Sequence, residues 1–189
     1  MDTIKKHLFL SFFLVFLIPA GAENNRDIAL DMFLIIDSSQ AMETPKNEVI
    51  SWLNDRVIDE ILINGDSITV WAAGERAEII YSDTISTDTS KSELRERIRN
   101  LNTDGRAADF TGALRELEPR VSGVPQDRLA YSMLITSSAE GLVPLLTGTA
   151  QQIFRWSRSE RYERWQVFIF APDIGPRVQQ AASAFLGAR

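Results

Sequence analysis

The chain has 189 residues, of which 44% are hydrophobic, and its 26 acidic and 20 basic residues give a net charge of −6. A net negative chain lacks the basic surface that nonspecific nucleic-acid binding requires, so no nucleic-acid partner is expected. There is no cysteine, and the one histidine is His7. Disulfides, zinc–thiolate sites and Cys–His or Ser–His catalysis in the body of the chain are therefore excluded.

The N-terminus has the three-part layout of a secretory signal peptide. Lys5 and Lys6 are followed by an apolar run over residues 8–18 and by the small residues Ala20-Gly21-Ala22. The run is shorter than the ~20 apolar residues that a membrane-spanning helix needs, which favours cleavage over an uncleaved anchor. We expect residues 1–22 to be removed and the protein to be exported, without stable membrane insertion afterwards. Export without disulfides fits a bacterial periplasm better than a eukaryotic secretory route.

Residues 23–189 are expected to form a single domain, because no repeat, low-complexity tract or long linker divides them. Continuous apolar runs predict buried strands, and apolar residues at helical spacing predict helices. The expected elements in chain order are strand 28–36, helix 45–62, strands 68–72 and 77–81, helices from 90 and from 109, strand 129–135, helix 150–162, strand 165–170 and helix 177–186.

Helical crossovers between strands require a mostly parallel sheet with helices on both faces. The short Gly74-Glu75-Arg76 link makes strands 68–72 and 77–81 an antiparallel hairpin, so one edge strand runs the other way. The expected fold class is α/β, with three Rossmann-like layers. Thr44-Pro45 is expected to begin the first helix, and Ser90 with Glu93 forms a capping-box pattern at the second.

Ligands of open α/β sheets bind beyond the carboxyl ends of the strands. At that edge stand Asp37-Ser38-Ser39-Gln40-Ala41-Met42, after an apolar strand, and Asp109-Phe110-Thr111-Gly112-Ala113-Leu114 at the start of the third helix. These two segments, with the order of elements, resemble a von Willebrand factor A-like domain. The resemblance implies a site for Mg²⁺ or Mn²⁺ built from Asp-x-Ser-x-Ser, a Thr and an Asp on these loops.

Several ligand positions of that motif have changed in this chain. Asp37 and Ser39 keep the first two positions, but Ala41 stands at the second Ser, and Ala108 stands at the Thr, with Thr111 close by. After the strand 129–135, Ser137 replaces the Asp. A single carboxylate with one hydroxyl is a poor Mg²⁺ site, because the ion gives up its water reluctantly. The metal residues that the resemblance implies are thus reduced to Asp37 and Ser39, and no cofactor is expected.

We expect Asp37 and Ser39 instead to hold their loop together through hydrogen bonds to backbone amides. The function indicated is a noncatalytic module that binds another protein through the loops, without a metal. The residues expected at this surface are Gln40, Asp109, Thr111, Ser137, Ser138 and Glu140.

Two other functions are compatible with the same residues. The first is an adhesion or complex-assembly module that depends on a divalent cation, with Asp109 or Glu140 as a substitute ligand. The second is a hydrolase built on a carboxylate pair, such as Asp37 with Asp109 or Glu140, although neither pair belongs to a known catalytic motif.

A second interaction surface is conceivable in the arginine- and aromatic-rich run 154–165, because Arg, Trp and Tyr are enriched at binding hot spots. Its candidate residues are Arg155, Arg158, Arg161 and Tyr162. A solvated helix face is the favoured reading of this run, with Glu160 and Arg164 as an i,i+4 pair.

Overall fold

The computed structural model describes residues 26–138, 141–142, 165–170 and 180. The expected signal peptide and the helices expected at 150–162 and 177–186 lie outside the described residues. The described elements are β1 (Leu30–Asp37), the 3₁₀ turn η1 (Gln40–Met42), α1 (Lys46–Trp52), the π-helix η2 (Leu53–Ile61), β2 (Ser67–Ala73), β3 (Ala77–Thr84), α2 (Asp88–Arg99), α3 (Phe110–Ser122), β4 (Leu129–Ile135) and β5 (Trp165–Phe170).

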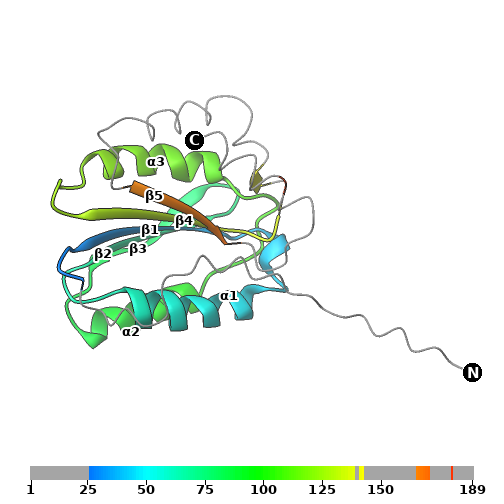
Figure 1. Ribbon diagram of the computed structural model, residues 1–189. Helices are drawn as coiled ribbons and strands as arrows, with labels where there is room; N and C mark the ends of the chain where they lie inside the picture. The colour runs from blue at the N-terminus through cyan, green and yellow to red at the C-terminus, as the bar shows by residue number, and fades with distance from the viewer. Residues whose placement is uncertain (1–25, 139–140, 143–164, 171–179, 181–189) are drawn as a thin grey trace, which may run out of the picture.

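The strands form a sheet in the order β3-β2-β1-β4-β5. β1 pairs in parallel with β2 and β4, and β4 pairs in parallel with β5, whereas β3 is antiparallel to β2. Helices cover both faces of the sheet: α1, η2 and α2 lie on one side and α3 on the other (Figure 1). The predicted α/β fold, with its mostly parallel sheet and one antiparallel edge strand, is therefore confirmed.

The larger described core lies between the sheet and the layer of α1, η2 and α2. Alternate β1 residues, among them Met32 and Leu34, enter it together with Leu53 and Val57 of η2 and Leu94 of α2. Side chains of a strand alternate between the two faces, so Phe33 and Ile35 point to the α3 side. No helix in the described part of the chain is both long and apolar enough to span a bilayer.

On the opposite face, α3 packs around Trp71 of β2. Trp71 is fully buried, and its indole N–H donates to a Glu116 carboxylate oxygen at 2.9 Å. The Arg120 guanidinium lies 5.6 Å from the centre of the Trp71 ring, within the range of a cation–π interaction. The Phe33 ring contacts Trp71 from β1, at 6.3 Å between centroids. Trp71 thus contacts α3 through both a hydrogen bond and a cation–π interaction, in addition to the buried apolar side chains of the helix.

The helix starts differ in detail from the prediction. α1 begins at Lys46 with Pro45 as its N-cap, so Thr44 is not the cap. α2 begins at Asp88 because the Thr87 hydroxyl accepts the Ser90 N–H, so the expected capping box at Ser90 and Glu93 is wrong. Ser90 instead lies within the first turn, where its carbonyl accepts the Tyr81 hydroxyl at 3.1 Å. Burial, followed by the charges of Asp83 and Glu93, raises the Tyr81 pKa.

The helix that follows β1 was expected to be regular, but its second half is a π-helix. In η2 the Leu62 N–H donates to the Val57 carbonyl at 2.9 Å, five residues earlier. π-turns widen a helix and are rare outside short insertions. Leu53, Val57 and Ile58 of this segment are buried against the sheet, so the wide turns are held by the core.

The amino ends of the strands are joined by two arginines. Arg128, just before β4, donates to Asp31 Oδ1 of β1 from both Nε and Nη2, at 2.9 and 2.7 Å. It also reaches the Gly65 carbonyl and the Ser67 hydroxyl at the start of β2. Arg26 forms an ion pair with the fully buried Asp66. This end of the sheet is therefore held by charged groups.

Candidate functional site

The candidate site lies at the carboxyl ends of β1 and β4, where Asp37 closes β1. The Asp37 side chain is fully buried. Its Oδ1 accepts the Ser39 N–H at 2.8 Å, and its Oδ2 accepts the Thr136 hydroxyl at 2.7 Å. A buried carboxylate is costly unless its oxygens are hydrogen-bonded, and here each oxygen has a partner. Asp37 thus holds the loop after β1 in place, as expected, and its side chain is buried within the domain.

Thr136 joins the two central loops, and the sequence reasoning did not single it out. It follows β4 directly and is fully buried. Besides donating to Asp37, its hydroxyl accepts the Ser138 N–H at 2.9 Å. The register pairs Ile36 with Ile135, so the next residues, Asp37 and Thr136, leave the sheet side by side. In the sequence, the one indication of this contact is that Asp37 and Thr136 each directly follow a predicted buried strand.

Backbone hydrogen bonds connect the loop after β1 to two further loops. The Ser38 N–H donates to the Ala73 carbonyl, and the Gln40 N–H donates to the Gly105 carbonyl at 2.8 Å. The Gly105 N–H in turn donates to the Ser38 carbonyl at 3.2 Å. Gly74 and Gly105 permit this approach, because a Cβ on Gly105 would lie 3.1 Å from the Ser38 carbonyl oxygen and 3.2 Å from the Gly74 Cα. Hydrogen bonds thus connect the loops around residues 37–42, 73–75, 105–109 and 136–138 into one surface, here named the loop face.

Asp109 stabilises the start of α3. Its Oδ1 accepts the Gly112 N–H at 2.8 Å, the usual bond of an N-cap, while its own N–H donates to the Gly74 carbonyl at 2.8 Å. Thr111 lies half-buried in the first turn of this helix. A Cβ on Gly141 would lie 2.9 Å from the Phe110 ring, which shows that the chain after β4 passes close to the same turn.

The accessible part of the loop face includes the turn that follows Asp37. Gln40 and Ala41 are exposed, whereas Ser39 is buried beneath them. The Ser137 hydroxyl donates to the Ala41 carbonyl at 2.5 Å, and Ser138 is half-buried beside it. Of the residues expected at this surface, Gln40 is exposed, Asp109, Thr111, Ser137 and Ser138 are half-buried, and Glu140 lies outside the described residues. Arg155, Arg158, Arg161 and Tyr162 also lie outside them.

The side-chain oxygens that the described loops offer fit a Mg²⁺ or Mn²⁺ ion poorly. Both Asp37 oxygens are engaged within the protein, and the Ser137 hydroxyl is directed at a carbonyl. Ala41 and Ala108 carry no side-chain oxygen. Mg²⁺ requires near-octahedral oxygen coordination, and no cluster of three or more His, Cys, Asp or Glu side chains suited to a metal occurs among the described residues. The two carboxylates considered for catalysis, Asp37 and Asp109, both serve hydrogen bonds within the fold.

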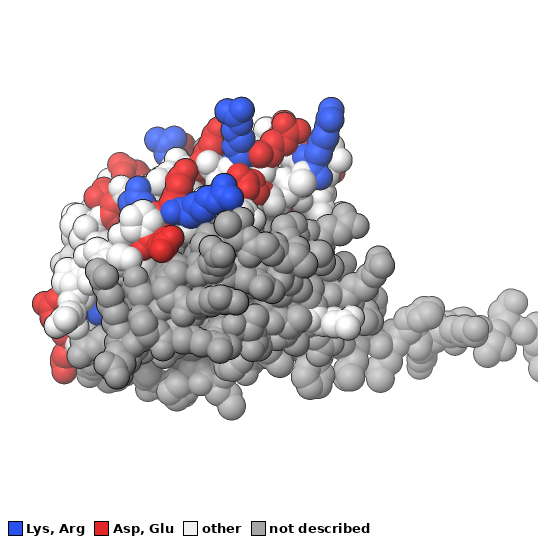
Figure 2. All heavy atoms as spheres, turned by 90° about the horizontal axis from the view of Figure 1, so that it is seen from above, with Lys and Arg blue, Asp and Glu red and all other residues white. Residues whose placement is uncertain are grey.

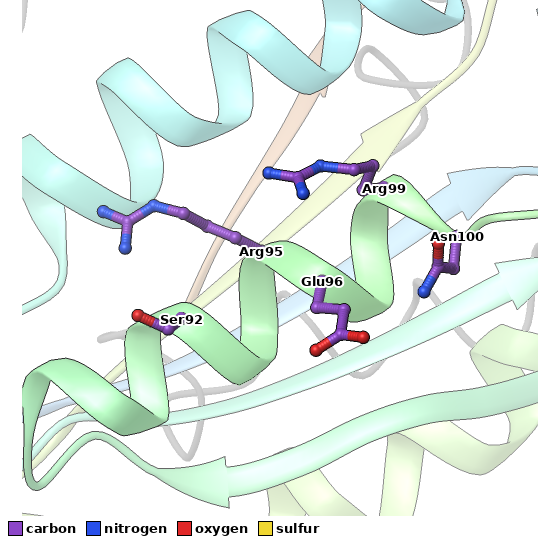
Figure 3. Close-up of a pocket in the computed structure, with 5 residues that line it drawn as sticks. All are labelled: Ser92, Arg95, Glu96, Arg99 and Asn100. Atoms are coloured by element: carbon purple, nitrogen blue, oxygen red, sulfur yellow. The ribbon is translucent and has the colours of Figure 1, made fainter.

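Two other surfaces were considered as sites. A hollow of about 350 Å³ lies along α2, lined by Ser92, Arg95, Glu96, Arg99 and Asn100. Figure 3 shows that Arg95 and Arg99 extend to the same side of the helix, but Arg95 is already paired with Asp59 of η2. Over the described part of the α3 side, basic and acidic side chains are interspersed (Figure 2). Neither surface shows a concentration of one charge.

Comparison with known proteins gives a limited sequence match. No family model matches the chain. An uncharacterized protein from Treponema pallidum (strain Nichols) is 28% identical over 91 residues, which cover 47% of this chain and 41% of that protein. The chain thus spans less than half the length of this relative.

Solved structures match over most of the chain. A von Willebrand factor type A protein from Catenulispora acidiphila has a TM-score of 0.61 at 18% identity, over 84% of this chain and 37% of that one. Manganese-loaded TRAP protein from Plasmodium vivax has a TM-score of 0.59 at 18% identity, over 86% and 64%. The PilB minor pilin from Streptococcus sanguinis has a TM-score of 0.59 at 12% identity, over 85% and 55%. The protein therefore has a von Willebrand factor A-like α/β fold.

Proposed function

We propose that this chain is an exported, noncatalytic module that binds another protein through the loop face, without a metal. The fold is shared with proteins named as a minor pilin and as a proximal thread matrix protein of the mussel byssus, which favours an interaction role. The absence of cysteine, and of any histidine after His7, removes the common nucleophile and base pairs. The N-terminal signal-like segment supports export.

The observation that carries this proposal is the hydrogen bond from the Thr136 hydroxyl to the buried Asp37 carboxylate. It joins the loops after β1 and β4 directly, through their own side chains. A loop surface fixed in advance loses little conformational entropy when it binds a partner, and this favours affinity. A surface held together by its own hydrogen bonds supports binding without a metal.

Metal independence is tested by thermal unfolding of the purified protein in millimolar Mg²⁺ or Mn²⁺ and, separately, in EDTA. A ligand that binds only the folded state at 100 times its Kd adds about 2.7 kcal/mol of stability. We expect the same Tm in every condition. A clear rise with Mn²⁺ or Mg²⁺ that EDTA reverses would overturn the metal-independent reading and favour the cation-dependent adhesion module, with Glu140 as the first substitute ligand to replace.

Binding through the loop face is tested by Gln40→Arg, which places a long charged side chain on an exposed position. Asn64→Arg is the matched control, since Asn64 is exposed in the turn before β2, at the opposite end of the strands. Substituting Asp37 is less informative, because that side chain is buried. In affinity capture from the native envelope fraction, Gln40→Arg should lose the partner that wild type and Asn64→Arg retain. Equal capture by all three would exclude the loop face.

A further inference from the structure

β3 forms one edge of the described sheet. β3 is the last strand of the sheet order, and no described strand pairs with its outer side. Open edges can pair with other chains, and proteins commonly block them with Lys, Pro or a bulge. β3 contains neither Lys nor Pro. Its pairing with β2 shifts register once, between Val70 and Trp71, as at a β-bulge.

The two faces of this edge differ in chemistry. Glu78 and Asp83 pair with Ala72 and Ile68, whose side chains belong to the α2 side of the sheet. Both carboxylates are exposed, and neither forms an ion pair with a described residue. On the α3 side stands Ile79, which is 38% exposed, an unusual exposure for a large aliphatic side chain in this part of the chain. The edge therefore presents the carboxylates of Glu78 and Asp83 on one face and the aliphatic side chain of Ile79 on the other.

A hollow of about 400 Å³ adjoins the edge on the α3 side. Cross-strand hydroxyl pairs form its floor, with Ser67 to Thr84 at 3.2 Å and Thr69 to Ser82 at 3.0 Å. Its residues come from the start of β1, from β2, from the end of α3 and from the end of β3, including Phe33, Pro119 and Val124. Because β3 lines it, a strand added to β3 would have side chains beside this hollow.

Pairing between two copies of the chain is unfavourable at this edge. The antiparallel alignment of two β3 strands that pairs all of Ala77–Thr84 sets Glu78 directly opposite Asp83. Like charges opposite each other on one face of a sheet are destabilising. The same carboxylates would attract a strand that carries Lys or Arg at those positions. The charge of this edge therefore favours a basic strand from another protein over the β3 strand of a second copy.

We propose that the β3 edge and the adjoining hollow bind an extended segment of another protein as an additional strand. The segment alternates basic residues, which face Glu78 and Asp83, with aliphatic residues, which contact Ile79 and enter the hollow. Backbone hydrogen bonds to β3 supply affinity and the alternating side chains supply specificity, as in other strand additions. This site is separate from the loop face and does not depend on its function.

The test uses a fluorescent peptide of alternating Lys and Val, equal in length to β3, titrated with the full chain and followed by anisotropy. We expect saturable binding, with slowed amide hydrogen exchange in β3. Replacing both Glu78 and Asp83 by Lys should weaken binding at least about tenfold, or about 1.4 kcal/mol. Val124→Trp, which places a bulky ring in the hollow from a residue outside β3, should also weaken it. Replacing both Glu48 of α1 and Glu96 of α2 by Lys, an equal change of charge away from β3, should leave it unchanged.

A second peptide, N-methylated at alternate residues, has the same side chains but cannot pair along the edge. It should fail to bind wild-type protein, which separates strand addition from simple charge attraction. Equal binding of the methylated peptide overturns the proposal, and so does equal binding by the double Lys variant. No saturable binding below about 1 mM, a free energy of about −4 kcal/mol, also overturns it.

Discussion

Thr136 and Asp37 show how two side chains connect the loops at the carboxyl end of the sheet. The Asp37 carboxylate is fully buried, with an amide on one oxygen and the Thr136 hydroxyl on the other. Hydrogen bonds to a charged group contribute more than those between neutral groups, and leaving a buried charge unpaired is costly. The hydroxyl of Thr136 is therefore a structural requirement of this loop arrangement.

Removing the Thr136 hydroxyl should lower the free energy of unfolding. Thr136→Val keeps the shape but leaves Asp37 Oδ2 and the Ser138 N–H without a partner, so the free energy of unfolding should fall by about 2–3 kcal/mol. Thr136→Ser keeps the hydroxyl and loses one methyl group, at about 1 kcal/mol. Urea unfolding measures both. Equal losses for Val and Ser would mean that packing, and not the hydrogen bond, is what Thr136 contributes.

At the scale of elements, the loop face depends on how closely three loops approach one another. Ser39, two residues beyond the end of β1, forms an isolated parallel bridge with Gly105. Gly74 lies against the same turn, where its Cβ would be 2.9 Å from the Ser38 hydroxyl oxygen. The contacts of Gly105 are with backbone atoms, while the nearest contact of Gly74 is a side-chain atom that can rotate.

A methyl group at Gly105 should thus cost more than one at Gly74. Gly105→Ala must push the Ser38 carbonyl and the Gly74 backbone aside, and overpacking of this kind typically costs about 1–3 kcal/mol. Gly74→Ala should cost less, because Ser38 can change rotamer. Gly123→Ala is the control: its Cβ contacts are 3.4 Å or longer and its φ is −88°, so chemical denaturation should find it nearly neutral. A neutral Gly105→Ala would show that the loops can separate freely.

Across the whole molecule, the two ends of the sheet are held by different forces. Ion pairs join the amino ends through Arg128 with Asp31 and Arg26 with Asp66, whereas hydrogen bonds from backbone amides and the Thr136 hydroxyl, two of them to the Asp37 carboxylate, join the carboxyl ends. Arg128 contacts β1, the turn before β2 and the start of β2, so one side chain connects separate parts of the chain.

Arg128→Met should therefore destabilise the entire domain. It leaves Asp31, whose side chain is 13% exposed, without its cation, and removing one partner of a poorly solvated pair costs several kcal/mol, here about 2–4. Arg106→Met is the matched control, because its pair with Glu75 is 3.9 Å apart and 90% exposed on the arginine side. The control should change the Tm by less than about 1 °C, whereas Arg128→Met should lower it by several degrees.

The fold was largely predictable from the sequence, because buried strands and helices have distinct patterns of apolar residues. Strand 129–135 and the hairpin at Gly74 were found in this way. The π-helix was not, since its apolar spacing over Leu53 and Val57 also suits an α-helix and only packing decides between them. Thr136 was missed for a similar reason: a hydroxyl after a strand has no evident partner until the register places it beside Asp37.

The hydrogen bonds of the loop face also determine how the domain would bear mechanical load. Bonds between neighbouring strands lie across the strand axis. A partner that holds Gln40 and pulls along β1 would therefore load the bonds to β2, to β4 and to Gly105 in shear, all at once. A segment added at the β3 edge and pulled sideways would instead separate one bond at a time. We expect the loop face to withstand tension and the edge of β3 to release under it.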